Sequence, residues 1–134
     1  MRDISLDDSI DYPWHSIELS TDQFVVCHQG FTQHRVLIVD NEGHIIKSYG
    51  GPAGSSTGQL NGPCCLTVDR YDNVYVADYN NNKVQLLSPT MTHLCDVTLS
   101  KHQLRQPYRI HLDEMNGLMY IGERSGRLLV VSVK

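Results

Sequence analysis

The chain has 134 residues and a mass of 15.2 kDa, which is the size of one domain or of part of one. Its net charge of −4 disfavours a partner held mainly through phosphates, because such proteins usually have an excess of basic residues. No apolar run approaches the roughly 20 residues that a membrane helix requires, so we expect no membrane contact.

The cysteines and histidines indicate a reduced protein without a bound group. Four cysteines show no C-x-x-C spacing, and residues 1–11 are acidic and polar, where a signal peptide would be basic and then apolar. We therefore expect a cytoplasmic protein. The seven histidines are scattered singly, whereas zinc ligands occur in close pairs. We expect neither a metal site nor a cofactor.

Short apolar runs predict strands along the whole chain. They are rich in β-branched and aromatic residues and are bounded by Asn, Gly, Asp and Ser. In chain order they lie at 14–19, 24–27, 36–39, 45–49, 64–69, 74–77, from 83 onward, 94–99, 108–113, 119–121 and 128–131. No window of a dozen residues has helical apolar spacing without an intervening Gly, Pro or Asn cluster. The sequence predicts an all-β protein built from up-and-down hairpins.

A threefold repeat organises these strands. The pattern apolar-x-x-Pro ends at Pro13, Pro63 and Pro107, so successive units are offset by 50 and 44 residues. After each proline come two strands joined by a turn, a polar loop, a cation and a third strand. The first two units then have a fourth strand, whereas the third reaches Lys134 without one.

The start of the chain has the pattern of a fourth strand. Residues 1–6 read like residues 94–99, so we expect an outer strand whose own unit is absent. The chain then divides into an outer strand of a preceding or partner unit, two complete units, and a unit lacking its fourth strand. These segments are 1–8, 9–50, 51–100 and 101–134.

The second unit resembles an NHL repeat, the propeller blade found at the C-terminus of many tripartite-motif proteins. The resemblance rests on GQLNGP at 58–63, NVYVAD at 73–78 and NNNKVQL at 80–86. The first unit departs at His28, where the family usually has an acidic residue, and the third has a shortened loop at 124–126. The resemblance implies three four-stranded antiparallel β-propeller blades, forming half of a six-bladed ring or a fragment of one.

Three blades do not close a ring, because each blade packs its apolar faces against two neighbours. Two arrangements remain open. In one, a symmetric homodimer forms a six-bladed ring, and residues 1–6 supply the partner's missing outer strand. In the other, the remaining blades belong to a longer protein. We favour the longer protein.

The resemblance implies that the loops entering each blade share one face with the loops between second and third strands. That face mixes aromatic, amide and basic groups, a composition that suits a protein partner. The predicted partner-binding residues are Tyr12, Phe31, Gln33, His34, Asn61, Tyr79, Asn80, Asn81, Arg105 and Arg124. Structural roles are expected nearby: Asp78–Lys83 and Glu123–Arg127 as ion pairs across short loops, and Trp14 as a side chain buried between blades.

We expect no catalytic residues. Cys27 and His28 are adjacent on one strand and so point to opposite faces. Some NHL-like propellers are lyases that hold zinc with histidines on the ring axis, but the histidines of this chain do not recur at one repeat position.

The sequence therefore predicts a non-catalytic protein–protein interaction module. If the full protein is of the tripartite-motif kind, the resemblance implies the substrate-recognition part of a ubiquitin ligase. The alternative is a propeller face that binds single-stranded RNA through a local basic patch in the third unit. The arginines of that patch are Arg105, Arg109, Arg124 and Arg127.

Overall fold

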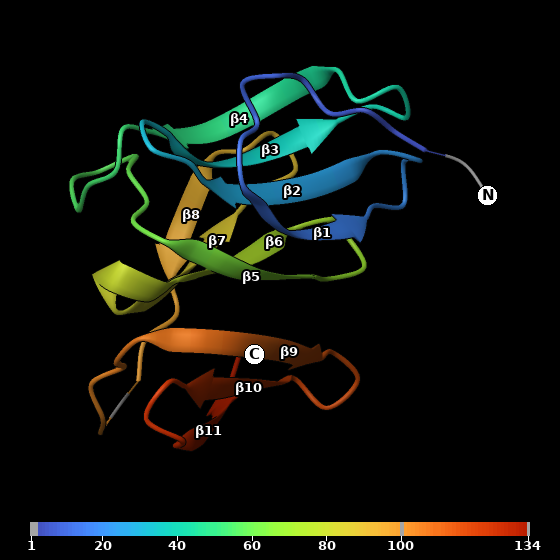
Figure 1. Cartoon of the computed structure of the whole chain (residues 1–134). Coiled ribbons are helices and arrows are strands. Elements are labelled where there is room, and N and C mark those ends of the chain that lie inside the picture. The colour runs from blue at the N-terminus through green and yellow to red at the C-terminus, as the bar shows by residue number, and fades with distance from the viewer. Residues whose placement is uncertain (1–2, 100, 134) are drawn as a thin grey trace.

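The computed structural model describes residues 3–99 and 101–133, which form three antiparallel sheets (Figure 1). Blade 1 contains β1 (Pro13–Glu18), β2 (Phe24–Gln29), β3 (His34–Val39) and β4 (Ile45–Gly51). Blade 2 contains β5 (Pro63–Val68), β6 (Val74–Asp78), β7 (Lys83–Leu87) and β8 (His93–Asp96). Blade 3 contains β9 (Pro107–Asp113), β10 (Leu118–Glu123) and β11 (Leu128–Ser132). The all-β prediction is confirmed.

Each blade begins at its proline and runs up and down through adjacent strands. The pairing of first and second strands shifts register directly after Pro13 and Pro63, and opposite Pro107 it shifts at Glu123. A proline has no N–H to give to a ladder, so a register irregularity is the position where a sheet tolerates it. Of the residues that the structure describes, only Tyr79–Asn81 form a helix, a single 3₁₀ turn.

No helix in residues 3–99 and 101–133 is long and apolar enough to cross a membrane. The residues before β1 form no strand within the described part of the chain. Leu6 instead packs against the apolar face of blade 1. The assignment of residues 1–8 to the outer strand of another blade stays a prediction, and Met1 and Arg2, which belong to that segment, lie outside the described residues.

The core lies between the blades, because alternate residues of each strand face opposite neighbours. Between blades 1 and 2, Val25 and Cys27 pack in one cluster with Leu66 and Val76. The corresponding cluster between blades 2 and 3 consists of Cys64, Cys65, Tyr75, Ala77, Val84, Leu104, Ile110, Met119, Ile121 and Val131. The first strands lie side by side, with β5 between β1 and β9 (Figure 1).

The three sheets do not close into a ring, and the outer face of blade 1 is left open. On blade 1, Val26 and Val39 are buried beneath Leu6, beside an open groove of about 470 Å³. Trp14 lines that groove and is 52% exposed, so none of the three blades provides its predicted burial, which stays a prediction for a completed ring. The indole ring of Trp14 faces outward because none of the three blades lies on this side of β1.

Candidate functional site

The loops that enter each blade and the loops between second and third strands are joined at one end of the stack. In blade 2, the Asn80 N–H donates to the Asn61 carbonyl at 2.8 Å. In blade 3, the Arg124 N–H donates to the Gln106 carbonyl at 3.1 Å. We call this surface, formed by residues 9–12, 30–33, 59–62, 79–82, 103–106 and 124–127, the loop face.

The residue before each proline turns the entering loop. Tyr12, Gly62 and Gln106 have φ values of 51°, 78° and 43°. Left-handed backbone costs a non-glycine residue about 1–2 kcal/mol, so blades 1 and 3 adopt this bend without the residue type that favours it. The bend sends the chain into the first strand and leaves the side chain of Tyr12 exposed.

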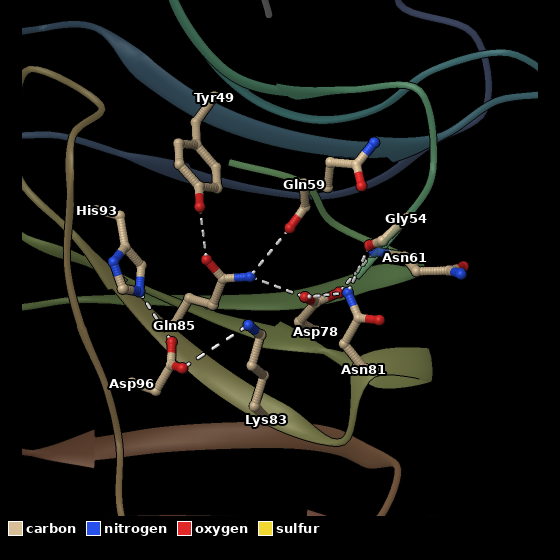
Figure 2. Close-up of polar contacts among 10 residues, drawn as sticks. All are labelled: Tyr49, Gly54, Gln59, Asn61, Asp78, Asn81, Lys83, Gln85, His93 and Asp96. Carbon is tan, nitrogen blue, oxygen red and sulfur yellow. Dashed lines mark hydrogen bonds and ion pairs between the residues drawn. The ribbon is translucent and has the colours of Figure 1, made fainter. Parts of the chain in front are cut away.

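In blade 2, the buried carboxylate of Asp78 holds the entering loop (Figure 2). It accepts hydrogen bonds from the Asn61 N–H at 2.7 Å, from Asn81 Nδ2 at 2.8 Å and from Gln85 Nε2 at 2.8 Å. Gln85 Nε2 also donates to the Gln59 carbonyl at 3.3 Å. Burial raises the pKa of Asp78 above its ordinary value, and the hydrogen bonds oppose that shift. These bonds make Asp78 a structural group.

Lys83 does not form the predicted ion pair with Asp78. Its Nζ lies 3.7 Å from Asp96 Oδ2 on β8 instead, as Figure 2 shows. The cause is Gln85, which stands two residues further along β7 and takes the donor position beside Asp78. A neutral amide therefore replaces the expected cation in this blade.

In blade 3, the predicted Glu123–Arg127 pair is confirmed. Arg127 Nε and Nη2 donate to the two carboxylate oxygens of Glu123 at 2.6 and 2.9 Å. Glu123 also accepts the Arg105 N–H at 2.7 Å, and Arg127 Nη2 donates to the Gln103 carbonyl at 3.0 Å. The bond from Arg127 lowers the pKa of Glu123, against an opposing effect of burial.

Blade 1 also joins the end of its second strand to its entering loop, but here the acidic residue is in the loop and not on the strand. His28 stands where the other blades have Asp78 and Glu123, and Asp11 stands two residues before the proline. Arg35 Nε donates to His28 Nε2 at 3.0 Å, so the ring proton is on Nδ1, which donates to the Asp11 carbonyl at 2.9 Å. All three blades thus use the end of the second strand to hold the entering loop.

Four of the predicted site residues are engaged in holding the loops together. Asn80 Nδ2 donates to Asn61 Oδ1 at 3.2 Å, and Asn81 Nδ2 donates to the Gly54 carbonyl at 2.8 Å. His34 Nδ1 accepts the Gly62 N–H at 2.9 Å, which joins blade 1 to blade 2. Burial lowers the pKa of His34, in keeping with its role as a neutral acceptor.

Tyr12 and Phe31 are the exposed large apolar side chains of the loop face within the described residues. Their rings meet edge to face with centroids 5.2 Å apart, and their exposed fractions are 58% and 88%. Gln33, in the same loop as Phe31, is half-buried and accepts the Gly30 N–H through its carbonyl at 2.9 Å. The pair comes from two loops of blade 1, one entering the blade and one joining β2 to β3.

The remaining predicted residues lie at blades 2 and 3. Tyr79 is half-buried against the cluster between those blades, and its hydroxyl accepts a hydrogen bond from Arg124 Nη1 at 3.1 Å. Arg105 is exposed. Tyr108, which sequence reasoning did not single out, meets the Tyr79 ring at 6.2 Å. The available signal was its place directly after Pro107, which matches the place of Trp14 after Pro13.

Neither a protein-family model nor a curated protein sequence matches the chain. Many solved structures are similar to it, and three of them follow. A selenomethionine-substituted virginiamycin B lyase from Staphylococcus aureus is 12% identical with a TM-score of 0.61, covering 96% of this chain and 44% of its own. A streptogramin B lyase is 15% identical with a TM-score of 0.54, covering 87% and 39%. A protein of unknown function from Bacteroides caccae is 15% identical with a TM-score of 0.51, covering 90% and 46%.

These likenesses establish the fold, and at such low identities they establish the fold alone. The chain is built of β-propeller blades. It spans less than half the length of each of the three similar structures.

Proposed function

We propose that this chain is a non-catalytic interaction module of NHL propeller type whose loop face binds a protein. The observation that carries the proposal is the Tyr12–Phe31 pair, which extends two aromatic rings from loops into solvent. Aromatic side chains are enriched at protein interfaces and supply much of the binding energy when a partner buries them. A rigid scaffold that presents such loops is the usual design of a recognition module.

The non-catalytic part of the proposal is supported by the residues of the innermost strands. His15, Cys65 and Arg109 hold the same position after the three prolines, so no histidine recurs there. Cys27 and Cys64 are buried, which raises the pKa of each thiol to about 12, and a protonated thiol is a poor nucleophile. Two of the three similar structures named above are lyases. Catalysis by this chain is therefore the alternative that an experiment should examine.

Within this proposal, the blades select the substrate of a tripartite-motif-like ubiquitin ligase. The support is the NHL-like sequence of blade 2 together with the propeller fold. All four cysteines are free thiols, which supports a reducing, cytoplasmic location. The ring would be completed by further blades of a longer protein or by a second copy of this chain.

The experiment compares two aromatic surfaces of the same chain. The test variant is Tyr12→Ala with Phe31→Ala, and the control is Tyr71→Ala, an aromatic that is 69% exposed in the β5–β6 turn at the opposite end of the blades. Each protein is immobilised and exposed to a cytoplasmic extract, and bound proteins are quantified by mass spectrometry. We expect at least one protein to bind wild type and the control equally and to fall at least tenfold with the test variant. Equal protein profiles for all three would overturn the proposal.

A further inference from the structure

Four side chains form a continuous row across blades 2 and 3. Arg124 Nη1 donates to the Tyr79 hydroxyl at 3.1 Å, and the Tyr79 ring meets the Tyr108 ring edge to face at 6.2 Å. The guanidinium of Arg109 lies over the Tyr108 ring, 4.7 Å from its centroid. We call Arg124, Tyr79, Tyr108 and Arg109 the arginine–tyrosine row.

Both guanidiniums of the row keep their charge available. Within residues 3–99 and 101–133, the arginines found in ion pairs are Arg70 and Arg127, and neither Arg109 nor Arg124 belongs to one. Glu123, the neighbouring carboxylate, already binds Arg127 and the backbone of the entering loop. Arg109 and Arg124 are exposed. An incoming carboxylate therefore has two positive partners and no nearby acidic side chain to displace.

The aromatic rings between the arginines hold them in place. Tyr79 is anchored in the cluster between blades 2 and 3, so its hydroxyl is a fixed acceptor for Arg124. Tyr108 is partly exposed on β9 and supports Arg109 through a cation–π contact. Arranging the guanidiniums before binding lowers the side-chain entropy that a partner must otherwise overcome.

The charge around the row favours a short acidic peptide over a nucleic acid. In blade 1, the loop-face residues 9–12 and 30–33 contain one acidic side chain, Asp11, and no lysine or arginine, so they offer no cation to a polyanion that continues along the loop face. A single strand of several nucleotides needs cations on adjacent blades. A peptide with a few carboxylates needs only the row.

We propose that the arginine–tyrosine row binds an acidic segment of the partner protein. This inference rests on the proposed function and specifies the chemistry of the partner. The guanidiniums bind carboxylates of the peptide, and the tyrosine rings contact its apolar or aromatic side chains.

The test is a fluorescence anisotropy titration at 150 mM salt with a fluorescein-labelled octapeptide of repeating Glu-Tyr-Glu-Gly. A peptide with Gln in place of Glu is the neutral probe, and an eight-nucleotide uridylate strand is the RNA probe. The test variant is Arg109→Gln with Arg124→Gln. The control is Lys47→Gln with Arg70→Gln, which removes the same net charge away from the loop face.

We expect wild type to bind the Glu peptide at least tenfold more tightly than the Gln peptide. The test variant should lose at least tenfold of that affinity and the control less than twofold. Equal affinity for the two peptides, or equal losses in the two variants, would overturn the inference. Tighter binding of the uridylate strand, with the same dependence on Arg109 and Arg124, would overturn it in favour of RNA.

The test variant also separates this inference from the proposed function. A protein captured through Tyr12 and Phe31 that still binds the Arg109→Gln, Arg124→Gln chain unchanged leaves the proposed function standing and refutes the inference. If the Glu peptide binds through the row but no protein is captured through Tyr12 and Phe31, the proposed function is refuted and the binding of acidic peptides by the row stands.

Discussion

The junction between blades 1 and 2 and the junction between blades 2 and 3 make one contact with different chemistry. In the first, His15 Nδ1 accepts the Leu66 N–H at 2.9 Å. In the second, Cys65 Sγ accepts the Ile110 N–H at 3.5 Å. The acceptor is always two residues after one proline and the donor three residues after the next. An imidazole nitrogen is a stronger hydrogen-bond acceptor than a thiol sulfur. Unlike the sulfur, it can no longer accept a hydrogen bond once acid protonates it.

Further contacts extend this difference. The first junction adds the Gly62 N–H bond to His34 and a bond of 3.1 Å from Gln29 Nε2 to the Pro63 carbonyl. Both junctions also bury apolar side chains, among them Leu66 and Val76 in the first and Met119 and Ile121 in the second. One repeat geometry is thus compatible with a titratable imidazole or with a buried thiol at the same position of an apolar junction.

The largest effect is expected from removing core volume at either junction. Leu66→Ala and Met119→Ala each delete a fully buried side chain, one from each junction, and should lower the free energy of unfolding by about 2–5 kcal/mol. Urea unfolding followed by tryptophan fluorescence and circular dichroism measures this loss. Met115→Ala, at an exposed methionine, should stay within about 0.5 kcal/mol of wild type. If Leu66→Ala or Met119→Ala changed the free energy of unfolding as little as Met115→Ala, the junction of that residue would not be part of the core.

A smaller effect should distinguish the junctions by pH. Burial lowers the pKa of His15 and of His34, with Arg109 adding to the shift of His15. The unfolded chain then binds protons more readily than the folded one, so stability is present above the ordinary value of 6.5 and is lost as the pH falls below it. The free energy of unfolding should therefore be lower at pH 5.5 than at pH 7.5.

Asparagine variants isolate this effect, because Asn Oδ1 supplies an acceptor near the position of Nδ1 and does not titrate. His15→Asn with His34→Asn should reduce the loss of stability between pH 7.5 and 5.5. His102→Asn, at an exposed histidine of the linker before blade 3, should leave the loss as in wild type. An identical pH dependence in the double variant would show that the two histidines do not make the first junction titratable.

The smallest effect is expected in the reactivity of the thiols, which measures how often the second junction opens. Cys64 and Cys65 are buried there, whereas Cys95 on β8 is exposed. A disulfide-exchange reagent at pH 8 should titrate one thiol rapidly in the native chain, and Cys95→Ser should remove that rapid phase. The slow phase should report opening of the blades. Two rapid thiols in the native chain would mean that one of the junctions, the first with Cys27 or the second with Cys64 and Cys65, opens readily.

The strands could be predicted because their signals are local. Period-2 runs and a recurring proline determine where each blade begins, and β8 alone is shorter than its predicted segment, ending at Asp96. The differences from the prediction involve side chains whose surroundings are set by other segments. Trp14 is exposed because its burial needs a neighbouring blade, and Lys83 turns to Asp96 because Gln85 occupies its expected partner.

The loop face could be predicted in composition but not in its internal bonding. The sequence indicated aromatic and basic loop residues, and the partner-binding role of these residues stays a prediction. It did not reveal that Asn81 and His34 would be held by other loops, since those bonds depend on how the blades stack. The Tyr79–Tyr108 contact likewise joins the 3₁₀ turn after β6 to β9, and the two tyrosines are 29 positions apart in the chain.

The exchanged carboxylate of blade 1 has a consequence for the modularity of the repeat. Moving residues 9–12 in front of blade 2 would bring the Asp11 carboxylate, which is 39% exposed beside His28, near the buried carboxylate of Asp78, and the two negative charges would repel each other. The entering loop of blade 1 is therefore matched to its own sheet and mismatched to the sheet of blade 2. Similar repeats within one chain can in this way avoid exchanging segments with each other during folding, and any shuffling of the blades has to transfer loop and sheet as a matched pair.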